Sequence, residues 1–184
     1  GIFLISFCST KTEPETDTSL NNNVTKPDSL IDSTNDSIID TASLEIKFKP
    51  TGNYTNHKTK TASLRISLKT ASDSLKKTAL ENLILNQLIP HWYGTKWDFS
   101  GYTDVPNQGV IACGYFVSTV MKHAGFNVNR YKLAQQDPLN ETKTVACDDS
   151  VDIYEVNSVD LQKIFNETYQ EGLYFVGLDF HVGF

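Results

Sequence analysis

The chain carries a cysteine and a histidine in the order and setting that thiol chemistry needs. Cys113 opens the segment Cys-Gly-Tyr-Phe-Val-Ser-Thr-Val-Met, and His181 follows 68 residues later in Leu-Asp-Phe-His-Val-Gly-Phe. Free N–H groups and the positive end of the macrodipole at a helix start favour a thiolate. A nearby imidazole can take up the thiol proton or pair with the thiolate. The two residues therefore predict a cysteine nucleophile, Cys113, served by a histidine base, His181.

The residues after Cys113 predict a helix that ends near Ala124. Its apolar positions recur at helical spacing and are expected to face the core; they are Phe116, Val117, Val120, Met121 and Ala124. Gly125 follows as a left-handed helix cap. This helix would hold the sulfur of Cys113 at its N-terminal end.

A single strand is expected from Leu173 to Phe184, and its side chains would alternate between two faces. One face is apolar and large: Tyr174, Val176, Leu178, Phe180, Val182 and Phe184. The other face is mostly small and polar: Phe175, Gly177, Asp179, His181 and Gly183. This alternation predicts that His181 faces a cleft. The simpler alternatives are an ordinary surface histidine and, for Cys113, a small buried hydrophobic residue.

The remaining periodic segments complete the expected domain. Apolar residues alternate with charged or polar ones at 44–48 and 64–68, which predicts two strands or one hairpin. A helix is expected from Asp73, as its N-cap, to Pro90, and another from Ser158 to Gly172. Helices followed by a sheet indicate an α+β fold over residues 44–184.

Charge is distributed unevenly along the 184 residues. Residues 9–43 hold seven acidic residues and two lysines, whereas residues 44–184 hold 15 acidic and 14 basic residues. The second part is thus nearly neutral and lacks the basic stripe that polyanion binding needs. Nucleic acid is not an expected partner.

The first residues are similar to a bacterial lipoprotein signal. Residues 1–7 are apolar or small and run directly into Cys8, although Phe7 stands where a small residue is preferred. They are too few to span a bilayer, which takes ~20 residues, but they fit the end of a signal-peptide apolar region. Residues 1–8 are therefore interpreted as a partial signal with Cys8 as the lipidated residue, and residues 11–13 loosely resemble the surface-export signal of Bacteroidota lipoproteins. A truncated buried strand is the alternative.

Residues 9–43 are expected to be a disordered acidic tether. They consist mainly of Thr, Ser, Asn, Asp and Pro, and cannot bury enough apolar surface to offset the entropy of ordering. The tether would link the domain to an extracytoplasmic membrane surface, with the lipid as the only membrane contact. The start at Gly1 and the apolar run that stops at Phe184 indicate a fragment that lacks both ends.

From about Trp92 to Phe184 the chain resembles the papain-like cysteine hydrolases, and among them the NlpC-type peptidoglycan endopeptidases and amidases. The resemblance lies in the helix-opening Cys-Gly-Tyr-Phe-Val and the strand His-Val-Gly-Phe, with Trp-Tyr-Gly-Thr-Lys-Trp before them. It implies a papain-like fold, a nucleophile on a helix packed on an antiparallel sheet, and amide cleavage through a thioester. Peptide or peptidoglycan would be the substrate, no cofactor would be needed, and strands beyond Phe184 would be missing, with a residue that orients the imidazole.

The same resemblance gives half of an oxyanion hole to the backbone N–H of Cys113. Papain has a glutamine six residues before its cysteine as the second donor, but here that position is Asn107 and Gln108 is one residue closer. Gln108, Trp92 and Tyr93 are the candidates for this role. Trp92, Tyr93 and Trp97 could also wall a substrate cleft, or cap the core instead.

The remaining cysteine and the histidines are weighed against other chemistry. Cys147 lies in an acidic segment, where Asp148 and Asp149 would raise the pKa of a thiol and disfavour it as a nucleophile. A disulfide between Cys113 and Cys147 would remove the nucleophile and is disfavoured by the helix-start setting of Cys113. The four histidines show no zinc-binding spacing, and no metal is expected. His123 is expected to face solvent. A papain-like module that binds peptide or glycan without turnover is the alternative to the enzyme.

Overall fold

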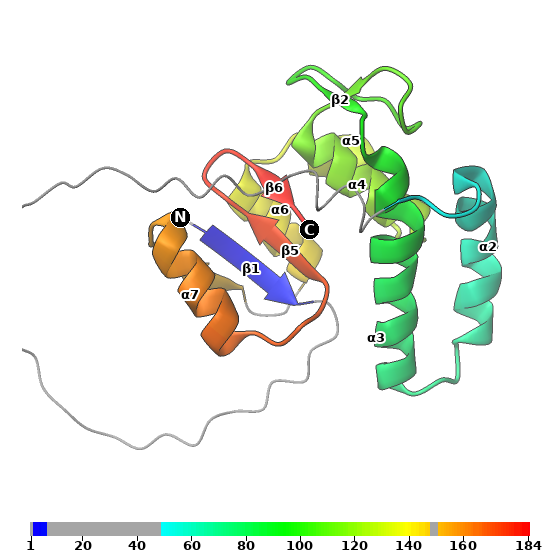
Figure 1. Ribbon diagram of the computed structural model, residues 1–184, viewed down its shortest axis with the longest axis horizontal. Helices are drawn as coiled ribbons and strands as arrows, with labels where there is room; N and C mark the ends of the chain where they lie inside the picture. The colour runs from blue at the N-terminus through cyan, green and yellow to red at the C-terminus, as the bar shows by residue number, and fades with distance from the viewer. Residues whose placement is uncertain (1, 7–48, 148–150) are drawn as a thin grey trace, which may run out of the picture.

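An antiparallel sheet of four short strands forms one half of the molecule (Figure 1). The computed structural model describes residues 2–6, 49–147 and 151–184. The strands lie in the order β4 (Asp152–Tyr154), β1 (Ile2–Ser6), β5 (Tyr174–Gly177) and β6 (Val182–Gly183). With the helices described below they give the chain the α+β fold that its sequence predicts.

The segment interpreted as a signal-peptide end is a strand of this sheet. In β1, Phe3 pairs with Ile153 of β4 on one side and with Gly177 of β5 on the other. Cys8 and the tether lie outside the described residues. Residues 2–6 cannot have both roles, because a segment that is cleaved off before lipidation cannot pair in the sheet of the mature protein. None of the described helices has the length and apolar character needed to cross a bilayer.

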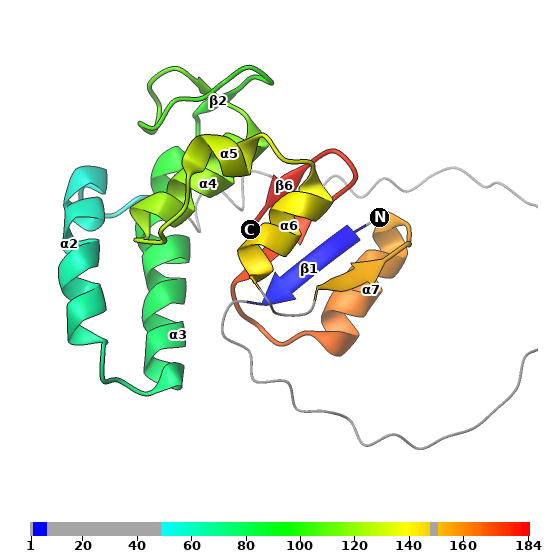
Figure 2. The ribbon, with the colours of Figure 1, turned by 180° about the vertical axis from the view of Figure 1, so that it is seen from behind.

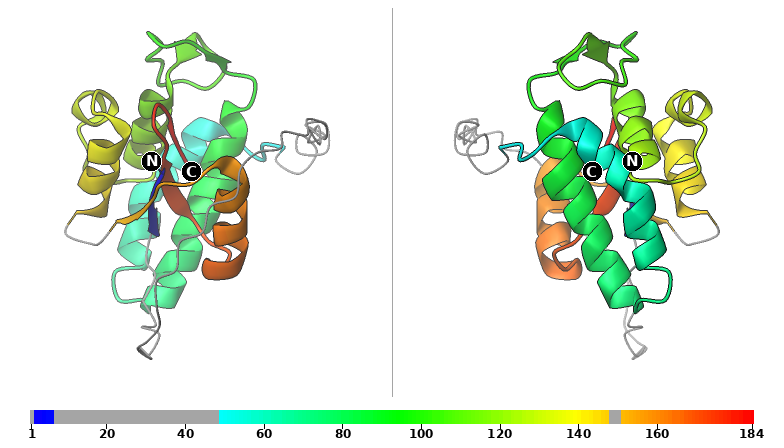
Figure 3. Two further views of the ribbon diagram at one scale, coloured as in Figure 1. Left: turned by 90° about the vertical axis from the view of Figure 1, so that its left-hand side faces the viewer. Right: turned by 90° about the vertical axis from the view of Figure 1, so that its right-hand side faces the viewer.

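Helices α6 (Pro138–Ala146) and α7 (Ser158–Thr168) lie on opposite sides of the sheet (Figure 3). Helix α6 crosses β1 and β5, next to the short helix α5 (Arg130–Ala134) (Figure 2). Its first turn is capped by Asp137, whose carboxylate accepts from the N–H of Asn140 at 3.0 Å. The side chain of Asn157 caps α7 in the same way. Such caps satisfy N–H groups that have no partner inside the helix.

Two helices stand beside the sheet half as a hairpin, α2 (Tyr54–Ser67) and α3 (Asp73–Glu81) (Figure 1). The strand predicted at 64–68 is therefore wrong, because most of that segment is the last turn of α2. Only part of the alternating apolar pattern is buried in this helix, since Leu64 packs on the core whereas Ile66 is exposed. Residues 44–48 lie outside the described residues. The N-cap of α3 is Ser72, one residue before the predicted Asp73.

Helix α3 runs directly into two irregular turns before the pocket region. It continues as the π-helical segment η1 (Asn82–Leu88) and the 3-10 turn η2 (Ile89–Trp92). Pro90 lacks an N–H and sits in the first turn of η2, where that donor is not needed. The helix predicted to end near Pro90 thus exists, and its end places Trp92 in the core.

Helix α4 (Cys113–His123) lies between the two halves and contributes to both cores. Toward the helical hairpin, Val120 packs with Leu83, Leu88 and Trp92. Toward the sheet, Val117 and Met121 share a cluster whose other members are Leu133, Ala146, Phe175 and Val182. The predicted helix, its apolar stripe and its cap at Gly125, with φ of 89°, are confirmed.

The single strand predicted from Leu173 to Phe184 is wrong, because the chain folds there into a β5–β6 hairpin. The N–H of Leu178 donates to the carbonyl of His181 at 2.7 Å and closes the turn. The turn interrupts the alternation of faces, and residues from both predicted faces, Phe175 and Val182, are buried. Phe175, placed on the polar face, is 0% exposed, whereas Phe180, placed on the apolar face, is 95% exposed at the tip. Helix α7 likewise ends at Thr168, before the predicted Gly172.

Candidate functional site

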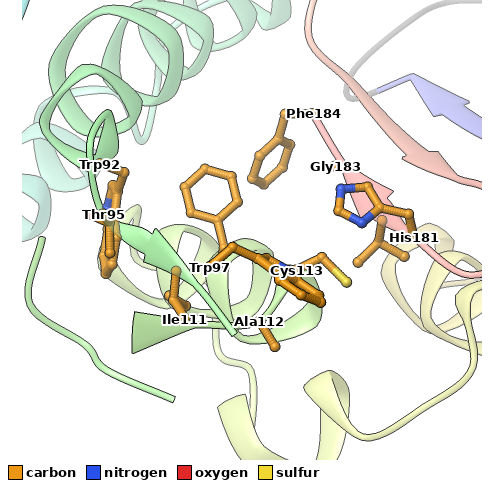
Figure 4. Close-up of a pocket in the computed structure, with 11 residues that line it drawn as sticks. Trp92, Thr95, Trp97, Ile111, Ala112, Cys113, His181, Gly183 and Phe184 are labelled. Carbon is orange, nitrogen blue, oxygen red and sulfur yellow. The ribbon is translucent and has the colours of Figure 1, made fainter. Parts of the chain in front are cut away.

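A pocket of about 280 Å³ contains both predicted catalytic residues (Figure 4). It lies where α4, the segment 92–112 and the β5–β6 hairpin meet. Its lining residues are Trp92, Thr95, Trp97, Ile111, Ala112, Cys113, Phe116, His181, Val182, Gly183 and Phe184. Cys113 and His181, 68 residues apart in the sequence, thus share one cavity.

Cys113 is the first residue of α4, as predicted. Ala112 precedes it in an extended conformation and provides no side-chain cap. The N–H groups at the start of α4 therefore stay directed at the pocket end of the helix. The thiol is free and half-buried. Free N–H groups and the positive end of the helix dipole at this position can stabilise a thiolate and a developing oxyanion.

Close packing of α4 on α5 fixes the position of the sulfur. Gly114 lies so near α5 that a Cβ atom there would stand 2.8 Å from the carbonyl oxygen of Ala134 and 3.1 Å from its Cα. Both are backbone atoms, which cannot move aside as a flexible side chain could. The glycine after the cysteine is therefore required by the approach of the two helices.

His181 comes from the end of the hairpin turn, directly before β6. Its backbone is held by the turn hydrogen bond from Leu178, and its side chain is exposed. The next residue, Val182, is buried in the sheet core. The candidate base, His181, thus has a fixed backbone and a solvent-exposed side chain. It reaches the pocket from a hairpin turn and not, as the sequence predicted, from the face of a continuous strand.

The two candidate groups lie on the same side of the pocket. Figure 4 shows the sulfur of Cys113 on the side where His181 lies, with Trp92 and Thr95 on the opposite side. Among the described residues no hydrogen bond joins the sulfur to the imidazole. Catalytic hydrogen bonds are commonly long in an unliganded site and tighten when substrate binds.

Trp92 and Trp97 line the pocket, whereas Tyr93 does not. Trp92 is only 5% exposed, so it both walls the cavity and belongs to the core, the two roles considered for it. Its Nε1–H donates to the Tyr54 hydroxyl at 3.0 Å. Trp97, on β2 (Lys96–Trp97), is 62% exposed at the rim.

The Tyr54 hydroxyl also bonds Nδ1 of His123 at 2.7 Å. The prediction that His123 faces solvent is therefore wrong, because it closes this hydrogen-bonded chain at the end of α4. Burial, with smaller contributions from nearby Lys58 and other charges, lowers the pKa of His123 to about 4. The imidazole is thus neutral at physiological pH and suited to a hydroxyl partner.

Gln108, a candidate second oxyanion donor, is exposed and outside the pocket lining. The neighbouring Asn107, in the left-handed region at φ of 59°, is also engaged elsewhere. Its Nδ2 donates to the carbonyl of His91 at 2.9 Å, and its N–H donates to Oγ1 of Thr95 at 2.9 Å. Asn107 thereby holds the turn that brings Thr95 to the pocket lining.

A buried arginine fixes the loop between β2 and β3 (Val110–Ile111). Arg130 is buried, and its guanidinium donates to Oγ1 of Thr119 and to the carbonyls of Tyr102 and Thr103. These carbonyl and hydroxyl acceptors replace the hydrogen bonds to water that the guanidinium loses when it is buried. This role is not predictable from the sequence pattern, since the partners are a threonine hydroxyl and two backbone carbonyls that lie distant along the chain.

Aromatic residues that the sequence assigned to the core or to a strand face form the floor of the pocket. The ring of Phe116 stands edge-on to Trp92 at 5.9 Å and to Phe184 at 6.3 Å. Phe184 in turn meets Phe175 at 6.2 Å. This contact chain joins the core of the helical half to that of the sheet half beneath Cys113. Only the fold brings these residues together.

The other chemical candidates do not converge on this pocket. Cys147 is exposed and free at the end of α6, so no disulfide joins it to Cys113. In the part of the chain that the structure describes, no group of three or more His, Cys, Asp or Glu side chains is arranged to hold a metal ion.

No family model matches the chain, and no curated protein or solved structure matches it significantly.

Proposed function

We propose that this protein is a cysteine-dependent amide hydrolase of papain-like type, with Cys113 as the nucleophile and His181 as the general acid and base. The observation that carries the proposal is the shared pocket, with a free thiol at the first position of α4 and an imidazole on the adjacent hairpin. The packing of α4 on an antiparallel hairpin through Val117 and Val182 agrees with this type of fold.

In the proposed reaction the Cys113 sulfur attacks an amide carbonyl and a carbon–sulfur bond forms. His181 takes the thiol proton and delivers it to the leaving nitrogen as the carbon–nitrogen bond breaks. The acyl group then remains on sulfur as a thioester. Water, deprotonated by His181, attacks the thioester, the carbon–sulfur bond breaks, and the thiol is restored.

The oxyanion would be held by N–H groups at the start of α4. The backbone N–H of Cys113 is one donor, and the macrodipole of α4 adds to its effect. Loss of one such donor costs about 3 kcal/mol of transition-state stabilisation.

One observation favours the alternative, a papain-like module that binds peptide or glycan without turnover. The His181 ring is exposed, and no hydrogen bond joins it to the Cys113 sulfur among the described residues. A binding module needs the pocket but not an activated thiol. Measuring the reactivity of the thiol separates the two functions.

The test is alkylation of the protein by iodoacetamide over a range of pH, with each adduct mapped by mass spectrometry. The enzyme predicts that Cys113 is alkylated well below the ordinary thiol pKa of about 8.5, and that the apparent pKa rises in His181→Ala. Cys147, which is exposed, free and outside the pocket lining, is the internal control, and its reaction is expected to be unaffected by His181→Ala. Reaction of Cys113 only at alkaline pH, unaffected by His181→Ala, would overturn the hydrolase and favour the binding module.

We propose further that the substrate is a cell-envelope peptide reached from a lipid anchor at Cys8. This part depends on the sequence pattern of residues 1–43 alone. The intact mass of the protein purified from its native membrane tests it, because cleavage before Cys8 removes β1 whereas retention of residues 2–6 keeps the sheet whole. A retained Gly1–Phe7 segment would exclude the anchor and leave the hydrolase unaffected.

A further inference from the structure

The lining of the pocket beside Cys113 is mainly apolar and is unsuited to binding a charged group. Seven of its eleven lining residues are apolar or aromatic, namely Trp92, Trp97, Ile111, Ala112, Phe116, Val182 and Phe184. Among the residues that the structure describes, His181 is the only lining residue with a titratable nitrogen, and no described Lys, Arg, Asp or Glu lines the cavity. A carboxylate or ammonium group taken into it would lose its hydration without gaining a partner.

The enclosed and open sides of this cavity are not equivalent. Trp92 and Ile111 are buried, and Trp92 lies on the side of the cavity away from His181 (Figure 4), so they form its inner wall. His181 is exposed and stands at the side open to solvent. In amide cleavage the leaving amine receives its proton from the histidine and departs, whereas the acyl group stays bonded to sulfur. The amine therefore leaves past His181, and the acyl group occupies the enclosed apolar side.

From these features we infer that the pocket selects an uncharged, apolar acyl group, such as one that carries an aromatic ring. The inference rests on the proposed function, because it assigns the acyl side from the direction in which the amine leaves. The volume of about 280 Å³ admits a phenyl group with a short linker, whereas acidic stem-peptide side chains do not match the lining.

The test uses three chloromethyl ketones that share one reactive group and differ on the acyl side: one with a phenylethyl group, one with a carboxyethyl group, and chloroacetone. The sulfur displaces chloride in each, so adducts at Cys113 can be counted by mass spectrometry. Burial of a phenyl group predicts alkylation of Cys113 about ten- to a hundredfold faster by the phenylethyl ketone than by the carboxyethyl ketone. The same thiol in guanidinium chloride, without a pocket, is expected to show little preference.

A pair of variants places the preference in the pocket. Trp97→Ala removes a rim residue that lines the cavity, and Tyr102→Ala removes an aromatic side chain that does not line it. The two are equally exposed, at 62% and 63%, so neither is expected to unfold the protein. We expect the phenylethyl preference to fall several-fold in Trp97→Ala and to persist in Tyr102→Ala.

The outcomes separate this inference from the function on which it rests. A Cys113 that reacts rapidly with all three ketones at equal rates overturns the apolar acyl pocket and leaves the hydrolase standing. A faster reaction with the carboxyethyl ketone overturns it as well. A Cys113 that reacts with none of them faster than in guanidinium chloride overturns the proposed function itself.

Discussion

The Trp92 side and the Val182 side of the pocket are supported by different kinds of contact. In the helical half, the Tyr54 hydroxyl joins the indole N–H of Trp92 to the imidazole of His123, although Nε2 of His91 is buried without a partner. In the sheet half, Glu141 of α6 is 1% exposed, and its Oε1 has no hydrogen-bond partner. Trp92 is therefore held by a directional bond, whereas Val182 and Phe184 on the other side of the pocket are held by apolar packing. The hydrogen-bonded chain of the sheet half, from Tyr154 through Tyr169 to Asp152, lies away from the pocket lining.

This difference indicates how the site is positioned. Trp92 is held by a hydrogen bond from its side chain, whereas His181 is held only through its backbone and the buried neighbour Val182. The nucleophile lies between them on α4, which packs on both cores. The sheet side should therefore respond most strongly to lost packing volume, and the helical side to lost hydrogen bonds.

The largest expected effect is that of Phe175→Ala in the sheet half. Phe175 is fully buried and contacts Phe184, so truncation opens a cavity beneath the pocket. We expect a loss of about 3–5 kcal/mol in the free energy of unfolding, measured by urea denaturation. Phe180→Ala, in the same hairpin, is the matched control and should change stability by less than about 0.5 kcal/mol. Similar losses in both variants would contradict the hairpin and support one continuous strand.

The same pair shows what the sequence could and could not predict. Helix α4 was predictable because periodicity and a glycine cap are local signals, and with it the place of Cys113 at a helix start. The hairpin was not, because Leu178 to His181 contains no glycine or proline and the turn depends on pairing between β5 and β6. His181 does line the pocket, as predicted, but the prediction rested on a continuous strand that the structure does not contain. Phe116, Phe184 and Thr95 were missed as pocket residues since only tertiary contacts bring them together.

The isolated carboxyl of Glu141 should give stability a pH dependence that belongs to the sheet half. Burial raises its pKa from 4.5 to about 8. The folded state thus holds a proton that the unfolded state releases, and stability falls as pH rises from about 4.5 through 8. At about 1.4 kcal/mol per pKa unit, we expect a loss of about 2–4 kcal/mol across this range. Denaturation midpoints measured between pH 5 and 9 report it.

Glu141→Gln serves as the comparison for that measurement, because it keeps the size of the side chain and removes its charge. The difference in unfolding free energy between wild type and variant should change steadily in favour of the variant as pH rises. Using the difference removes the contribution of all other titrating groups. Parallel profiles for the two proteins would show that Glu141 is ionised in the folded state and has a partner.

Gly114→Ala should have the next largest effect, by displacing α4 from α5. The added Cβ would meet backbone atoms of Ala134 at 2.8 and 3.1 Å, so the helices must separate. We expect a loss of about 1–3 kcal/mol in stability and a slower alkylation of Cys113 by iodoacetamide. Gly183→Ala is the control on the hairpin side of the pocket, where a Cβ meets nothing within 4 Å. Equal effects of the two substitutions would show that the approach of α4 to α5 does not position the sulfur.

The smallest effect is expected from Tyr54→Phe in the helical half, which removes one hydroxyl and keeps the ring. The indole N–H of Trp92 and Nδ1 of His123 would both lose their partner. Buried polar groups left in this way cost about 1–2 kcal/mol, a loss that thermal or urea denaturation measures. Tyr102→Phe, at an exposed tyrosine, is the control and should change nothing measurable.

The pH profile of the same variants shows whether this chain of hydrogen bonds acts as a unit. The pKa of His123 is about 4 in the folded protein, below its usual 6.5. Protonation therefore favours the unfolded state, and stability is lost as pH falls from about 6.5 through 4. This slope is opposite in sign to that of Glu141, and His123→Asn should abolish it while Glu141→Gln leaves it intact. If Tyr54→Phe destabilises the protein equally at every pH and leaves the acid slope unchanged, the hydroxyl anchors Trp92 alone. A reduced slope would instead mean that the hydroxyl also helps to keep His123 neutral, and the helical wall would then be one linked network from α4 to the pocket.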